Sequence, residues 1–66
     1  MITQDTLHVL LIEDSEIDAK RVITLLRYST YAQYEVVHAN CLGAGIIKLE
    51  QFPFQAALVD LGLPDT

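Results

Sequence analysis

The sequence predicts an open α/β fold in which a parallel, doubly wound sheet carries helices on both faces. Two observations support this class. Three short apolar runs with the pattern of buried strands alternate with two amphipathic segments over short connections, and 52% of the 66 residues are apolar. Alternation of this kind implies parallel strands joined by right-handed crossovers. Three strands and two helices are only part of such a fold.

The first predicted strand covers residues 7–12 (LHVLLI), a nearly continuous run of mostly branched apolar side chains. It ends at Glu13 and Asp14, and Ser15 follows as a plausible helix N-cap. Acidic residues in the next turn suit the positive end of the helix dipole. We expect an amphipathic helix of about four turns that ends near residue 29. Its apolar stripe comprises Ala19, Val22, Ile23, Leu25 and Leu26.

The second strand is predicted at residues 34–39 (YEVVHA), and Asn40 is expected to cap a second helix over residues 41–51. Gly43 and Gly45 each cost that helix up to about 1 kcal/mol relative to alanine. Small residues at these two positions indicate that the helix packs closely on the sheet.

The third strand is predicted at residues 54–59 (FQAALV), after Pro53 ends the helix, and it is expected to be buried and to finish on Asp60. If the first strand lies between the other two, the third keeps an unpaired edge and an uncovered face. This edge predicts a homodimer or a domain swap through the third strand.

Three carboxylates follow adjacent strand ends. Glu13 and Asp14 come after the first strand and Asp60 after the third. If these two strands are neighbours, about 4.8 Å apart, their terminal side chains converge on one crevice. Such acids repel one another, and a hard divalent cation such as Mg²⁺ relieves the repulsion. A carboxylate beside Mg²⁺ can attack a phosphoryl group. Asp60 is the better nucleophile, and Glu13 and Asp14 are the better metal ligands.

Composition excludes several classes of function. Nine acidic residues against four basic ones give a net charge of −5, which argues against direct binding of nucleic acid or an anionic membrane surface. The N-terminus has no basic region followed by a long apolar stretch, so neither a signal peptide nor a membrane span is predicted. Cys41, as the single cysteine, fits a reducing compartment, and we expect a cytoplasmic protein.

Two segments carry a resemblance to a known family. LLIEDS at 10–15 and LVDLGLPD at 58–65 resemble the two N-terminal signature segments of response-regulator receiver domains, and the likeness runs from residue 7 to residue 66. The resemblance implies a flavodoxin-like fold, with Asp60 as the phosphoacceptor. It also implies that Glu13, Asp14, Asp60 and the backbone carbonyl of Gly62 hold Mg²⁺. Pro64 matches the proline that shapes the loop after the acceptor.

The family also implies partners. A receiver domain takes its phosphoryl group from a sensor histidine kinase or a phosphotransfer protein, so this chain is expected to be a signalling module and not an enzyme. Receiver domains continue through two more strands and three more helices, which carry a sensing Ser or Thr and a Lys. Residues 1–66 are therefore expected to be the N-terminal part of one domain. Neither Lys48, on the second helix, nor Thr66, in the loop, fits those two roles.

Other functions remain open at this point. A receiver-like module that binds partners without phosphorylation is the main alternative. A phosphatase of the haloacid dehalogenase type needs a second acid where Gly62 stands, and a nucleotide loop at LGAGIIK lacks its third glycine, replaced by Lys48. His38 and Cys41 form too small a set for a metal site and are interpreted as packing or surface residues.

Overall fold

The computed structural model describes residues 6–65. The first five residues and Thr66 lie outside this range. The prediction on a signal peptide at the N-terminus and the placement of Thr66 in the loop concern these residues and also lie outside it. The elements are β1 (Thr6–Ile12), α1 (Glu16–Arg27), β2 (Gln33–Ala39), α2 (Leu42–Gln51) and β3 (Ala56–Val59). The predicted alternation is therefore confirmed, and the described part of the chain is a small α/β fold. Neither of these two helices is long and apolar enough to cross a membrane.

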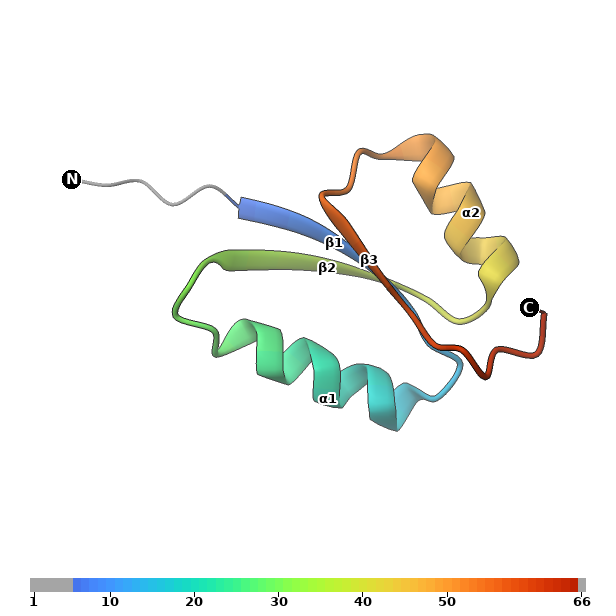
Figure 1. Cartoon of the computed structure of the whole chain (residues 1–66), viewed down its shortest axis with the longest axis horizontal. Helices are drawn as coiled ribbons and strands as arrows, with labels where there is room; N and C mark the ends of the chain where they lie inside the picture. The colour runs from blue at the N-terminus through green and yellow to red at the C-terminus, as the bar shows by residue number, and fades with distance from the viewer. Residues whose placement is uncertain (1–5, 66) are drawn as a thin grey trace.

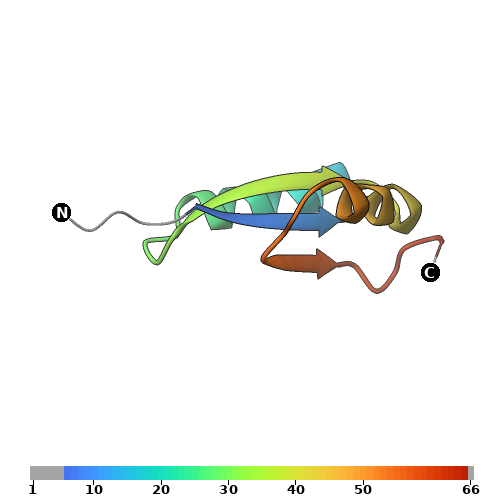
Figure 2. The same cartoon turned by 90° about the horizontal axis from the view of Figure 1, so that it is seen from above.

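The three strands form one parallel sheet in the order β2-β1-β3. Leu10 at the centre of β1 lies between Val37 of β2 and Ala57 of β3. The two helices lie on opposite sides of the strands (Figure 1). Seen from above, β3 is at the edge of the sheet next to β1 (Figure 2). The first strand thus lies between the other two, and this order brings the ends of β1 and β3 together.

The core on the α2 side of the sheet is a cluster of four buried apolar residues. They are Leu10, Ile12, Ala39 and Leu63. Gly45 of α2 is buried against this cluster. A Cβ atom on Gly45 would collide with Ile12 Cδ1 and lie 2.7 Å from Ile12 Cγ1. The predicted close packing of α2 on the sheet is confirmed at Gly45, whereas Gly43 is exposed.

Helix α1 begins as predicted but is shorter and less apolar on its inner face. The Ser15 hydroxyl accepts a hydrogen bond from the Asp18 N–H at 3.3 Å, so Ser15 is the N-cap. The helix ends at Arg27, before residue 29. Leu25 is 73% exposed, so its assignment to the buried stripe was wrong. At about 100° per residue, Leu25 lies roughly 120° around the helix axis from the buried Ala19.

The cap of α2 differs from the expected one. Cys41, and not Asn40, occupies the N-cap position, and its Sγ accepts a hydrogen bond from the Ala44 N–H at 3.4 Å. Asn40 is exposed and lies before the cap. The helix ends at Gln51, two residues before Pro53, as the proline predicts.

Strand β3 is shorter and more exposed than predicted. Gln55 precedes it and bonds to His8 twice, because the Gln55 N–H donates to the His8 carbonyl at 2.8 Å and its Oε1 accepts from the His8 N–H at 2.6 Å. All four residues of Ala56–Val59 are exposed, so the prediction of a buried strand was wrong. Within the described residues, β3 pairs with β1 alone and no helix covers it.

Candidate metal centre

Main-chain pairing places Glu13 and Asp60 side by side. Ile12 and Val59, the last residues of β1 and β3, are partners in the parallel sheet, so both strands leave it at the same edge. The Asp60 N–H donates to the Ile12 carbonyl at 3.0 Å, and the Glu13 N–H donates to the Ala39 carbonyl of β2 at 2.9 Å. These bonds extend the sheet by one residue and fix the backbone from which both carboxylates project.

The three acids predicted from the sequence come together at this edge. Glu13, Asp14 and Asp60 each offer a carboxylate oxygen within 4.8 Å of the others. Glu13 and Asp60 are half-buried, whereas Asp14 is exposed. One oxygen of Glu13, Oε2, is buried and has no hydrogen-bond partner among residues 6–65. A buried carboxylate oxygen without a partner is costly, so this position favours a proton or a cation.

Protonation is shared unequally between two of these acids. A hydrogen bond to Asp60, loss of hydration and the charges of Asp60, Asp14 and Asp18 raise the pKa of Glu13 to about 7. A hydrogen bond from the Gly62 N–H, followed by one from Glu13, lowers the pKa of Asp60. A proton bound by this pair without a metal therefore lies on Glu13, and Asp60 stays ionised.

No basic side chain in the described range neutralises the acids. Arg21 pairs with Asp18 at 3.7 Å and His8 lies 3.6 Å from Glu35, and neither contact involves Glu13, Asp14 or Asp60. Lys48 is part of α2, as expected. A basic side chain of residues 6–65 therefore does not compensate the negative charge of the three acids.

The turn after β3 lies beside Asp60. The Gly62 N–H donates to Asp60 Oδ1 at 3.0 Å, while Leu61 is 93% exposed and Leu63 is 4% exposed within the core. Gly62 is thus close to the acidic residues, as the sequence predicts. That its carbonyl is a metal ligand stays a prediction.

Asp65 joins this turn to α2 and was not anticipated as a functional residue. Its Oδ1 accepts from the Leu42 N–H at 2.8 Å and its Oδ2 from the Gly43 N–H at 2.9 Å. These two bonds lower the pKa of Asp65. The carboxylate thereby satisfies two of the free N–H groups at the start of the helix. Sequence patterns for caps are local, so they do not reveal a cap supplied from more than 20 residues away.

His38 is a second residue whose role the sequence did not reveal. Its Nε2 lies 2.7 Å from the Glu13 carbonyl oxygen, in a half-buried position at the end of β2. Because a carbonyl only accepts, Nε2 carries the hydrogen of this bond. His38 therefore holds the Glu13 main chain from the β2 side. The contact of His38 with Glu13 could have been inferred from the sequence only through the pairing of β1 with β2.

The donor set fits Mg²⁺. The three carboxylates supply hard oxygen ligands, and the buried Glu13 Oε2 lacks another partner in residues 6–65. Mg²⁺ in proteins is commonly held by one or two carboxylates and completes its octahedral shell with water or phosphate oxygens. The exposed Asp14 leaves such positions open to solvent.

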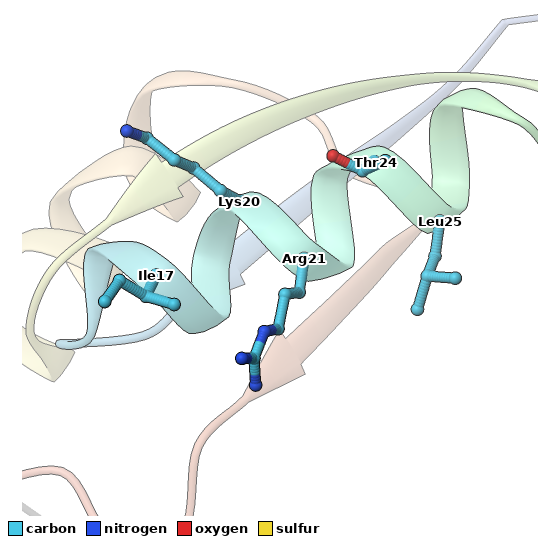
Figure 3. Close-up of a pocket in the computed structure, with 5 residues that line it drawn as sticks. All are labelled: Ile17, Lys20, Arg21, Thr24 and Leu25. Atoms are coloured by element: carbon cyan, nitrogen blue, oxygen red, sulfur yellow. The ribbon is translucent and has the colours of Figure 1, made fainter.

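Two other features do not belong to this centre. The LGAGIIK segment lies within α2, so its glycines are helical, and the nucleotide-loop alternative is contradicted. A shallow apolar hollow on α1 is lined by Ile17, Lys20, Arg21, Thr24 and Leu25 (Figure 3). No carboxylate lines this hollow. Comparison of the chain with known protein families, with curated proteins and with solved structures found no match.

Proposed function

We propose that this chain is a phosphoacceptor module of the response-regulator receiver type. It accepts a phosphoryl group from a histidine kinase or a phosphotransfer protein onto Asp60 in the presence of Mg²⁺, and it passes the signal on as a conformational change. In this proposal the elements from β1 to β3 correspond to the first five elements of a flavodoxin-like fold. The two motifs, LLIEDS and LVDLGLPD, provide the sequence argument.

One observation carries the proposal. The two motifs are distant in sequence, and their acids, Glu13, Asp14 and Asp60, have carboxylate oxygens within 4.8 Å of one another. Acids that served only as helix caps or solvated groups would gain nothing from this proximity, because like charges repel. A cation site beside a nucleophilic carboxylate accounts for all three.

The residues have separate tasks in the reaction. Asp60, kept ionised by its lowered pKa, attacks the phosphorus atom of a phosphohistidine through a carboxylate oxygen. An O–P bond forms as the P–N bond breaks, and the departing imidazole nitrogen keeps the electron pair and takes a proton from water. Mg²⁺ bound beside Asp60 would neutralise charge on the phosphoryl oxygens. Glu13 and Asp14 would hold the ion, and His38 and the Gly62 N–H hold Glu13 and Asp60 in place.

Phosphorylation by a small-molecule donor tests this proposal. We expect acetyl phosphate with Mg²⁺ to add one phosphoryl group to the chain, detected by intact mass and located on Asp60 by fragmentation after borohydride trapping. Asp60→Asn should abolish the addition, and chelation of Mg²⁺ should do the same. Glu50→Gln removes an exposed acid from α2 and is the matched control, which should be labelled normally. Labelling of Asp60→Asn to the wild-type extent would refute the assignment.

A further inference from the structure

We propose that Asp65 is a positioning residue that clamps the turn after β3 to the first turn of α2 and thereby holds Gly62 in place beside Asp60. This inference rests on the proposed Mg²⁺ site and adds a residue to it. It concerns a side chain that does not itself reach the metal ligands but determines the position of one of them.

The clamp is a bidentate hydrogen-bonded contact between distant parts of the chain. Both carboxylate oxygens of Asp65 accept main-chain hydrogen bonds, at 2.8 Å from Leu42 and 2.9 Å from Gly43. Hydrogen bonds from N–H groups to an ionised carboxylate are among the stronger ones in proteins, and a bidentate pair also fixes orientation. The positive end of the α2 dipole adds to the attraction. Asp65 thus restrains the direction as well as the position of the chain.

The turn between Asp60 and Asp65 is anchored at several points along its length. Asp60 is bonded through its N–H to Ile12, and Leu63 is buried in the core cluster. Gly62 lies between these anchors and is itself exposed. The Asp65 contact with α2 closes the far end of the segment. The position of Gly62 is therefore fixed mainly by the anchored residues on either side of it and less by contacts of Gly62 itself.

This arrangement matters because the ligand assigned to Gly62 is a main-chain carbonyl. A carboxylate ligand adjusts its position by rotating a side chain, whereas a carbonyl moves only with its backbone. A glycine has a wide choice of backbone conformations, so the turn must be restrained from outside. Residues that orient metal ligands without touching the metal typically change metal affinity 10- to 100-fold when they are removed.

A Mg²⁺ titration of the wild-type chain and three variants tests the inference. The amide signals of Gly62, Leu42 and Gly43 are followed by ¹H–¹⁵N NMR at pH 8, where Glu13 is mostly ionised. We expect Asp65→Ala to weaken Mg²⁺ binding by about tenfold and Asp65→Asn, which keeps one acceptor oxygen, by about threefold. Glu50→Gln removes an exposed charge from α2 and should change the affinity less than twofold.

The comparison of variants separates positioning from simple charge. Equal losses in Asp65→Asn and Asp65→Ala would mean that only the charge of Asp65 matters, and would overturn the inference. Wild-type affinity in both variants would also overturn it while leaving the proposed function intact. Failure of the wild-type chain to bind Mg²⁺ saturably would refute the proposed function itself and the inference with it. If Asp65→Ala loses its folded spectrum, the comparison of Asp65→Asn with Glu50→Gln decides: losses of equal size would overturn the inference.

A metal-free measurement gives a second readout. Hydrogen exchange at the Leu42 and Gly43 amides should be faster in Asp65→Ala than in the wild-type chain, because both N–H groups lose their acceptor. The Gly62 amide should exchange faster as well if the clamp restrains the turn. Unchanged exchange at Gly62, together with faster exchange at Leu42 and Gly43, would identify Asp65 as a helix cap without a positioning role.

Discussion

The side chains of Glu13 and Asp60, far apart in the sequence, carry carboxylate oxygens within 4.8 Å of each other at the ends of adjacent parallel strands. The pKa of Glu13 is raised to about 7, chiefly by Asp60, whereas the pKa of Asp60 is lowered, chiefly by the Gly62 N–H, so a proton bound by the pair lies on Glu13. Protonation of Glu13 and binding of a cation are two ways of relieving the same repulsion. They should therefore compete.

The first prediction concerns stability against pH in the absence of divalent cations. Between its ordinary pKa of 4.5 and about 7, Glu13 binds a proton in the folded chain more often than in the unfolded one. The free energy of unfolding therefore falls as pH rises through this range and is insensitive to Glu13 above it. Asp60 and Asp65 have lowered pKa values, so their contribution to stability is lost below about pH 3.8. We expect the highest unfolding temperature in mildly acidic buffer with chelator.

Glu13→Gln is the matched variant for this prediction. Glutamine keeps the shape of the side chain without the charge, so unfolding temperatures at pH 5 and pH 8 should come closer together. At pH 8 the variant should unfold at a higher temperature than the wild-type chain. A wild-type chain that is more stable at pH 8 than at pH 5 without metal would contradict the predicted coupling of Glu13 and Asp60.

The second prediction concerns the close contact of α2 with the sheet. Gly45→Ala places a methyl group against the buried Ile12, at a distance that real Cβ atoms do not adopt. Overpacking of this kind costs about 1–3 kcal/mol, which exceeds the gain of up to about 1 kcal/mol in helix propensity. We expect urea unfolding to show a net loss of about 1–2 kcal/mol.

Gly43→Ala is the control for that loss. A Cβ on Gly43 would lie 3.6 Å from Asp65 Oδ2, an ordinary contact, and the residue is exposed. The substitution keeps the N–H that bonds Asp65 and improves helix propensity, so stability should be unchanged or higher. Equal stabilisation by Gly43→Ala and Gly45→Ala would show that α2 does not depend on close approach to Ile12.

The third prediction concerns the edge of β3. Ala56–Val59 carries no charge, and Leu58 and Val59 are 42% and 44% exposed. Unpaired strand edges of this kind pair with other strands, so we expect the 66-residue chain to self-associate through β3 as concentration rises. Sedimentation velocity should show the shift. Leu58→Lys should suppress it, whereas Leu25→Lys on the exposed side of α1 should not. Equal suppression by both substitutions would locate the association elsewhere.

Much of the framework was predictable because local signals and topology agree. Apolar runs bounded by Glu13 and Asp60 marked the strand ends, and Ser15 marked the start of α1. Parallel pairing then placed the acids at one edge without further information. The candidate centre followed from the strand order alone.

The errors arose where a residue depends on distant parts of the chain. Asn40 was expected to cap α2, yet Cys41 is the N-cap, and Asp65 supplies two further acceptors from the turn after β3. Leu25 was assigned to the apolar stripe because of its spacing, but it lies roughly 120° around the helix axis from the buried Ala19 and is exposed. The role of His38 depends on β1 and β2 being neighbours in register. The contacts of Asp65 and His38 have no local sequence signature.

The most direct test of the central claim is the titration of the Glu13 side-chain carboxyl carbon by ¹³C NMR, with and without Mg²⁺. Without Mg²⁺ the midpoint should be about 7, because the proton is shared with Asp60. With saturating Mg²⁺ the midpoint should move well below that value, because the ion displaces the proton. A midpoint near the ordinary value of 4.5 without metal, or one that Mg²⁺ does not move, would contradict the claim that Glu13, Asp14 and Asp60 form one cation site.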